Sequence, residues 1–214
     1  KRNQTLLSAS GSMTSEKILN IEAVLQNYLL EESDFISRMK WPLNGRLNSQ
    51  LKLTGQIKNP NLKLNGQFTE ILLDDNEVPN SNFKIEMADQ NLQAEGIFLG
   101  NQIQSILDYP LAENGKPLRF RMKTQNWDFT PWLSLINAGS LNQDTSGNLT
   151  SEIELASPNG HLEEMSGSIK IQTFALTKQD LTLQNPLPLS ITAKNGVYDI
   201  QNFVLNSSKG KVEI

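Results

Sequence analysis

The stretch GRLNSQLKLTGQIK, residues 45–58, decides the fold class of this chain. Its odd positions are apolar or small, and its even positions are polar. Because successive side chains of a strand point to opposite faces, this alternation predicts a strand with one apolar and one polar face. The large apolar members of the stretch are Leu47, Leu51, Leu53 and Ile57.

The same alternation recurs along the rest of the chain. We expect a turn at Asn59–Asn61, after which a second strand begins. The apolar positions of the later segments are Leu62, Leu64, Phe68, Phe83, Ile85, Met87, Leu118, Phe120, Met122, Leu149, Ile153, Leu155, Ile169, Ile171, Leu187 and Leu189. Such segments, separated by Asn, Gly and Pro, predict an all-β, mainly antiparallel fold.

Three short helices are also expected. Apolar residues from Ile18 to Leu29 recur at spacings of three and four, which favours an amphipathic helix over residues 16–31. Thr130 and Pro131 resemble an N-cap and a first helical residue, which indicates a helix over 131–138. A third segment, 102–108, ends before Pro110.

An internal repeat organises the chain into two halves. The segment LNGRL around Gly45 is similar to TSGNL around Gly147, and the two glycines are 102 positions apart. In each copy an alternating strand, a proline and a further strand follow. We therefore predict two continuous domains, residues 1–110 and 111–214, each a short helix followed by strands, packed unit upon unit.

Composition narrows the range of functions. The chain has 23 Asn and 15 Gln among 214 residues, a net charge of −4 and a pI of about 5.1. An acidic chain has no basic field with which to displace counterions, so we expect no nucleic-acid partner. Cysteine is absent, and the only histidine is His161, so thiolate or multi-histidine metal sites are not expected.

Catalytic signatures are missing from the sequence. It contains no phosphate-binding glycine loop, no nucleophile elbow and no zinc-protease helix motif. Two carboxylate pairs, Asp74–Asp75 and Glu163–Glu164, could serve acid–base chemistry, but neighbouring strand residues face opposite ways and turn acids are usually solvated. We predict no catalytic residues, no cofactor, no metal and no enzymatic activity.

Several segments together resemble the TamB family of AsmA-like bacterial envelope proteins. They are PLNGRL at 42–47, LTGQIKNP at 53–60, LTLQNPLPL at 181–189, GVYDI at 196–200 and FVL at 203–205. The resemblance covers most of the chain, and its motifs consist of alternation together with Gly, Asn and Pro. It implies an elongated, curved β-groove whose concave face is apolar.

The resemblance also implies a function and a location. TamB-like proteins are implicated in moving phospholipid between the inner and outer membranes and in outer-membrane assembly. The apolar residues named above, from Leu47 to Leu189, would then form a lipid-binding groove for phospholipid acyl chains. The chain would lie in the periplasm, anchored in the inner membrane and docked to an outer-membrane barrel protein through segments outside this sequence.

The alternation alone leaves a second architecture open. Strands with one apolar face can also close into a β-sandwich, which would make the chain a binding or structural module of a larger envelope or secreted protein. The first residue is Lys1, and residues 211–214 resemble a strand that is cut short. We therefore expect the chain to be a piece of a longer protein.

Overall fold

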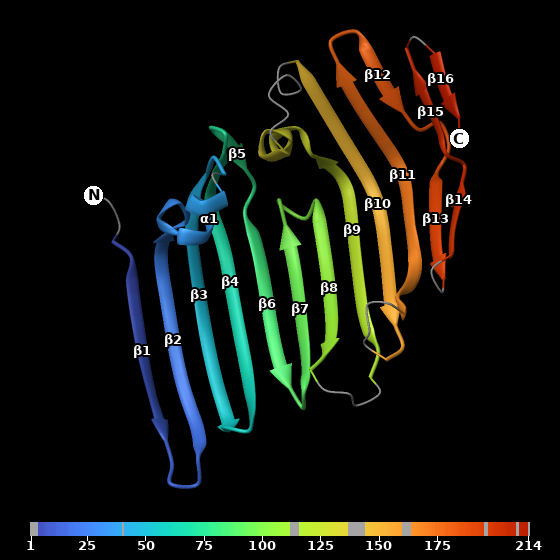
Figure 1. Ribbon diagram of the computed structural model, residues 1–214. Coiled ribbons are helices and arrows are strands. Elements are labelled where there is room, and N and C mark those ends of the chain that lie inside the picture. The colour runs from blue at the N-terminus through green and yellow to red at the C-terminus, as the bar shows by residue number, and fades with distance from the viewer. Residues whose placement is uncertain are drawn as a thin grey trace. The chain divides into compact units, whose positions relative to one another are not determined.

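Strands make up nearly all of the regular structure in the computed structural model (Figure 1), which confirms the all-β, mainly antiparallel fold class. The structure describes residues 4–39, 41–111, 116–136, 144–159, 164–194, 197–208 and 210–213. The chain divides into a first unit, Lys1–Gly100 with Ile106–Asn114, and a second unit, Asn101–Ser105 with Gly115–Ile214. Strand β8 contributes residues to both.

The elements follow one another in a simple order. The strands are β1 (Leu6–Met13), β2 (Ile18–Leu29), β3 (Leu43–Gln56), β4 (Asn59–Leu73), β5 (Asn76–Val78), β6 (Ser81–Ala88), β7 (Asn91–Phe98), β8 (Ile103–Pro110), β9 (Leu118–Asp128), β10 (Thr145–Ser157), β11 (Ser166–Lys178), β12 (Leu181–Gln184), β13 (Leu189–Lys194), β14 (Val197–Gln201), β15 (Val204–Ser207) and β16 (Gly210–Glu213). The helical segments are η1 (Leu30–Glu32), α1 (Asp34–Met39) and η2 (Thr130–Ile136).

The first unit contains an open sheet in the order β1-β2-β3-β4-β6-β7, and β5 pairs with the end of β4. Each of these neighbouring pairs is antiparallel. The β3–β4 hairpin turns at Ile57 and Lys58, two residues before the turn expected from the sequence, and Pro60 already lies opposite Gly55 within the pair.

The second unit contains the antiparallel order β9-β10-β11, after which the sheet divides. The last residues of β11, Ala175–Lys178, pair with β12, which leads on to β15 and β16. Its first residues, 167–171, pair instead with β13, which pairs in turn with β14. The long strand β11 therefore joins two short branches.

The helix predicted over residues 16–31 is wrong over most of its length, because strand β2 occupies residues 18–29, and only Leu30 and Glu31 are helical, in η1. The register of β2 on β3 shifts between Leu25 and Tyr28, and Asn27 takes a positive φ of 55° there. This bulge places Leu25 and Tyr28, three residues apart, on the same face of the sheet. Three-residue spacing caused by a bulge thus imitated the spacing of a helix.

The other two helix predictions had different outcomes. Residues 102–108 are not helical, since Ile103–Pro110 form strand β8. The third prediction is confirmed to residue 136 as the 3₁₀ segment η2, while residues 137 and 138 lie outside the described residues. The 3₁₀ segment begins at Thr130 itself, one residue earlier than predicted, and the Thr130 hydroxyl accepts a hydrogen bond from the Gly147 amide at 2.8 Å.

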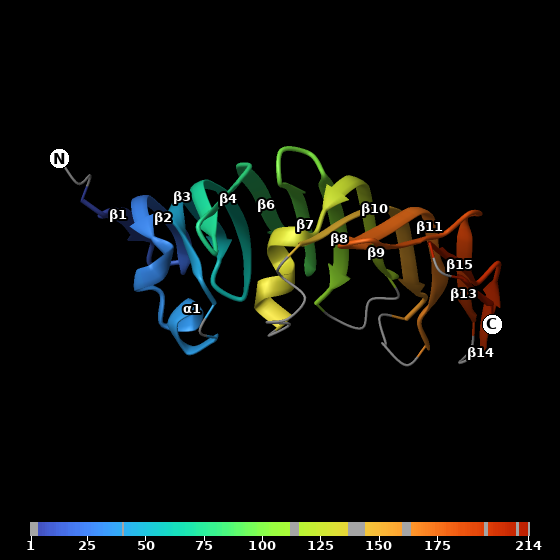
Figure 2. The same ribbon diagram turned by 90° about the horizontal axis from the view of Figure 1, so that it is seen from above.

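Helical segments that the sequence did not predict cover one end of the first unit. Leu30 of η1 is buried, and its Cδ1 lies 3.2 Å from the position of a β-carbon on Gly45 of β3. Ile71, Leu73 and Val78, at the end of β4 and in β5, are also buried, and Leu73 is fully inaccessible. Figure 2 shows η1 and α1 on a single side of the sheet of this unit. The most deeply buried apolar residues of this unit therefore include Leu30 of the helical cover and residues at the end of β4 and in β5.

Candidate functional site

Four rows of cross-strand neighbours form an apolar face on the first unit. Residues directly opposite each other in an antiparallel pair point to the same face, so the register assigns each side chain to a face. The rows are Gly11, Ile21, Leu53, Leu62, Met87 and Leu92; Ala9, Ala23, Leu51, Leu64, Ile85 and Ala94; Leu7, Leu25, Ser49, Gly66, Phe83 and Gly96; and Tyr28, Leu47, Phe68 and Ser81.

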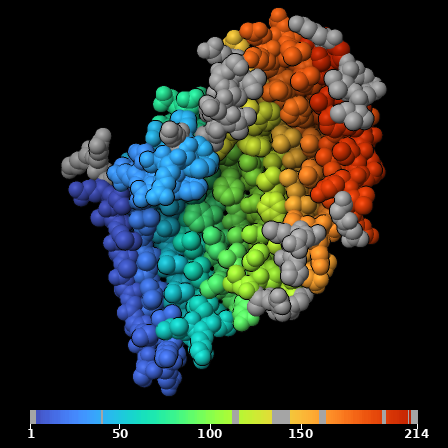
Figure 3. Space-filling model, viewed as in Figure 1, coloured from blue at the N-terminus to red at the C-terminus, as the bar shows by residue number. Residues whose placement is uncertain are grey.

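This apolar face is only partly shielded from solvent. Leu51, Leu64 and Ile85 lie on three successive strands in the middle of a row, yet each is only half-buried. The described strands of the first unit belong to one layer, and η1 and α1 cover only the end near Gly45. Figure 3 shows the helical segment over the upper ends of β2–β4 and side chains below it that are uncovered.

The second unit presents an equivalent set of rows. These are Phe120, Leu155, Gly167, Ala193 and Tyr198; Met122, Ile153, Ile169, Ile191 and Ile200; Thr124, Ser151, Ile171 and Leu189; and Trp127, Leu149 and Phe174. Leu118 lies on the same face, opposite Ser157, and is buried. Tyr198 and Ile200 on the outer strand β14 are 72% and 56% exposed, so this face is also open at that edge.

Most of the site residues predicted from the sequence lie in these rows, but two do not. Ile57 is in the β3–β4 turn and is 46% exposed, and Leu187 is in the loop before β13 and is 55% exposed. His161 and Glu163 lie outside the described residues, and Asp74 and Asp75 form the exposed turn between β4 and β5. The predicted site residues therefore share an apolar face within each unit, except for Ile57 and Leu187, which lie in a turn and a loop.

The structure adds face residues that the sequence reasoning missed. They come mainly from β1, β2 and β7, among them Leu7, Ile21, Leu25 and Leu92. The signal was present in β2, where Leu19, Ile21 and Ala23 alternate with the exposed polar residues Asn20 and Glu22. The helical interpretation of 16–31 concealed it.

The opposite, polar face of the first unit carries charged side chains in register. Lys52 donates a hydrogen bond to Glu22 at 2.8 Å, and Glu86 lies 2.9 Å from Lys84 and 3.3 Å from Lys63. The hydrogen bond from Lys84, followed by that from Lys63, lowers the pKa of Glu86 below its ordinary value. Two of these pairs, Lys52–Glu22 and Lys63–Glu86, join neighbouring strands, and Lys84–Glu86 lies within β6, so the face carries ionised, hydrated side chains.

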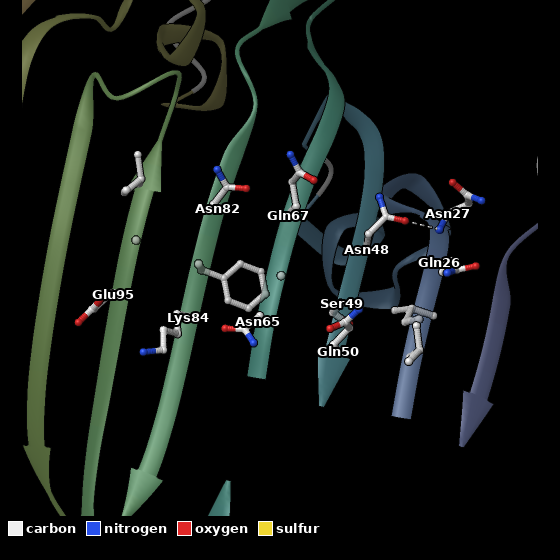
Figure 4. A pocket seen from close by; sticks show the side chains of 16 residues that line it. Gln26, Asn27, Asn48, Ser49, Gln50, Asn65, Gln67, Asn82, Lys84 and Glu95 are labelled. Atoms are coloured by element: carbon white, nitrogen blue, oxygen red, sulfur yellow. Dashed lines mark hydrogen bonds between the residues drawn. The ribbon is translucent and has the colours of Figure 1, made fainter. Parts of the chain in front are cut away.

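Amide side chains surround a shallow hollow of about 640 Å³ on the same polar face. Two rows of register neighbours border it, one containing Asn48, Gln67 and Asn82 and the other Gln50, Asn65, Lys84 and Glu95. Figure 4 shows these side chains side by side on successive strands. Amides both donate and accept hydrogen bonds, so the hollow favours water and other neutral polar groups.

Comparisons with known proteins supply no relative: no family model, no curated protein and no solved structure matches the chain. Among the described residues, no group of three or more His, Cys, Asp or Glu side chains is placed to hold a metal ion. None of the described helices is long and apolar enough to cross a membrane. The register rows define the candidate site, which is the apolar face of each unit.

Proposed function

We propose that this chain is a segment of a periplasmic lipid conduit. Its apolar face shields phospholipid acyl chains while they pass between the inner and outer membranes and so supports outer-membrane assembly. The observation that carries the proposal is the partial exposure of the central rows, such as Leu51, Leu64 and Ile85, in a unit whose described strands form one layer. Large contiguous apolar surface on a folded chain marks a binding surface.

The energetics favour acyl chains as the occupant. Each methylene that leaves water for an apolar surface gains about 0.8 kcal/mol, so a chain lying along several rows is held firmly. The row of Leu51, Leu64 and Ile85 offers no hydrogen-bonding side chains that would fix one position. Such a face binds a hydrocarbon without specific register, so lipid can slide along the strands and no catalytic residue is required.

The TamB resemblance extends this proposal to the whole protein. In that scheme the two units are successive repeats of about 100 residues in an elongated, curved β-groove. One parallel supports it: a glycine near the start of β3 and of β10 packs against a side chain from the preceding segment, Gly45 against Leu30 and Gly147 against Phe129. Anchoring in the inner membrane and contact with an outer-membrane barrel would belong to segments outside this chain.

The test compares two substitutions on adjacent residues of β4. Leu64→Asp places a carboxylate in the middle of the apolar face, and Asn65→Asp places one on the polar face. Each purified 214-residue chain would be incubated with a photo-crosslinkable phosphatidylethanolamine, and crosslinked lipid and thermal unfolding would be measured together. We expect wild type and Asn65→Asp to capture lipid and Leu64→Asp to lose most of it while it stays folded, with a melting temperature lowered by only about a few degrees.

The closed β-sandwich alternative gives the opposite result. There Leu64→Asp would bury an unpaired carboxylate and cost several kcal/mol, enough to unfold a domain of ordinary stability. Global unfolding of Leu64→Asp, or no lipid captured by wild type, would overturn the conduit in favour of that module.

A further inference from the structure

A second hollow, of about 390 Å³, lies on the polar face of the second unit. Arg119 and Arg121 of β9 border it on one side, and Ser166 and Ser168 of β11 border it on the other. Between them runs β10, where Ala156 lies opposite both Arg119 and Ser166. Because the side chain of alanine is a single methyl group, the space above Ala156 stays open between two guanidinium groups and two hydroxyl groups.

The two arginines have no ionic partner in the part of the chain that the structure describes. No carboxylate lies within 4.0 Å of either guanidinium, although Glu154 is the register neighbour of Arg121. The next cation on the same strand face, Lys123, differs, since its Nζ lies 3.9 Å from Glu152. The strand thus holds two cations whose hydrogen-bonding capacity is unused, beside one that faces a carboxylate.

We propose that this hollow binds a phosphate group, either inorganic phosphate or the phosphate ester of a lipid headgroup. Guanidinium groups match phosphate oxygens with paired, charge-assisted hydrogen bonds, and serine hydroxyls complete the shell as neutral donors. Within the described residues the Ser168 hydroxyl makes no hydrogen bond, and the Ser166 hydroxyl donates only a long one of 3.4 Å to the Ala156 carbonyl. Both hydroxyls are therefore available to a ligand.

Glu154 sets a limit on the affinity of the site. Its carboxylate borders the same hollow and lies in register between Arg121 and Ser168, so it repels a bound anion. The site therefore binds phosphate weakly and reversibly, and removal of this charge should strengthen binding. Because the hollow lies on the polar face, it stands apart from the acyl-chain path proposed for the apolar face.

The test is a titration of the whole chain with inorganic phosphate, followed by NMR amide shifts and calorimetry. Loss of two charge-assisted hydrogen bonds should weaken binding about tenfold or more in Arg119→Gln/Arg121→Gln. The matched control, Lys123→Gln/Lys170→Gln, removes the same charge from the same face outside the hollow and should change the dissociation constant less than about threefold. Glu154→Gln should tighten binding, and the shifted amides should be those of β9 and β11 at the hollow.

A vesicle arm distinguishes the two sources of phosphate. The same variants would be sedimented with phosphatidylcholine vesicles that contain or lack phosphatidylglycerol. Binding that falls in Arg119→Gln/Arg121→Gln but persists in the lysine control identifies a lipid headgroup, whereas phosphate binding without this vesicle effect identifies the free anion. The proposal is overturned if wild type binds no phosphate, or if both double variants lose affinity equally, which would indicate only a diffuse charge effect.

Discussion

The ring of Phe83 lies directly over Gly66 of the neighbouring strand, so that a β-carbon on Gly66 would overlap its Cζ atom. The two residues are register partners in the β4–β6 pair, and the ring also packs against Phe68 with ring centroids 5.4 Å apart. Because Gly66 has no side chain, the ring of Phe83 occupies the space where a β-carbon would otherwise stand, between the rows of Leu51 and Leu47.

Gly66→Ala should displace that ring at modest cost. Overpacking costs about 1–3 kcal/mol, but the Phe83 ring is the free end of a side chain on an open face, so we expect a loss of about 1 kcal/mol. Gly167→Ala should cost about 3 kcal/mol or more, because its β-carbon would overlap the backbone carbonyl oxygen of Glu154, which cannot rotate away. Urea unfolding of both variants measures the difference; equal losses would contradict this reading of the two sites.

The stability lost on replacing a leucine of β4 by alanine should depend on how deeply that leucine is buried. Leu73, the last residue of β4, is fully buried, so Leu73→Ala should lower the free energy of unfolding by about 2–5 kcal/mol. Leu64 is half-buried on the open face, and Leu64→Ala should cost only about 1 kcal/mol. Chemical denaturation with matched slopes tests this ranking. A cost at Leu64 as large as that at Leu73 would mean that a further layer covers the apolar face.

The sequence predicted the fold class because strand parity is a local property. Within 45–58 the alternation of leucines assigned Leu47, Leu51 and Leu53 to one face, and the register confirms that they share it. It failed in β2, where the bulge at Asn27 depends on an amide of the neighbouring strand. The backbone N–H of Asn27 donates to Asn48 Oδ1 at 2.9 Å, and this partner is 21 residues away in sequence. No window centred on β2 contains it.

The covered end of the first unit was also beyond prediction. The segment Asp34–Met39 is one short helix with Phe35 62% exposed, so it has no clear apolar stripe. Its position depends on tertiary contacts, such as Leu30 above Gly45 and the edge-on packing of Phe35 against Trp41 with ring centroids 6.2 Å apart. Similarly, the hollow beside Arg119 needs Ser168 from two strands away, a pairing that only the register of β9, β10 and β11 supplies.

The Asn27–Asn48 hydrogen bond should stabilise the bulge. Asn48→Ala removes the acceptor and leaves a part-buried amide without it, which should cost about 1 kcal/mol. Asn48→Asp keeps an oxygen in the same position and should retain most of the stability. Hydrogen exchange of the Asn27 amide reports the bond directly, and exchange in Asn48→Ala as slow as in wild type would show that another group holds the bulge.

The buried hydroxyl groups of Thr124 and Ser151 should stabilise the second unit. Thr124 is fully inaccessible, its Oγ1 accepts a hydrogen bond from the Ser151 amide at 2.8 Å, and it lies 3.0 Å from Ser151 Oγ. Thr124→Val keeps the shape but leaves that amide unsatisfied, so we expect a loss of about 1–3 kcal/mol. Ser151→Ala keeps the hydrogen bond from the backbone N–H of residue 151 to Thr124 Oγ1, so it should lower the free energy of unfolding by less. Thermal unfolding of both variants checks the order, and the reverse order would contradict it.

Acid should weaken the charged cluster of the first unit through Glu86. Hydrogen bonds from Lys84 and then Lys63 lower the pKa of Glu86 in the folded state below its value of about 4.3 in an unfolded chain. A carboxylate with a lowered folded pKa contributes stability that is fully present above the unfolded pKa. That contribution is lost as the pH falls through the lowered folded pKa.

The stability that Glu86 contributes, and its loss in acid, should therefore depend on Lys84 and Lys63. Carboxyl NMR titration should give a depressed pKa for Glu86 in wild type and an ordinary one in Lys63→Met/Lys84→Met. Thermal unfolding between pH 6 and pH 3 should show a shallower loss of stability in that variant. The control is Lys123→Met, because Lys123 faces Glu152 in the other unit, and this change should leave the Glu86 titration unchanged. Because these side chains are exposed, high salt should reduce the difference. An unaltered Glu86 titration after removal of both lysines would show that the cluster does not set its pKa.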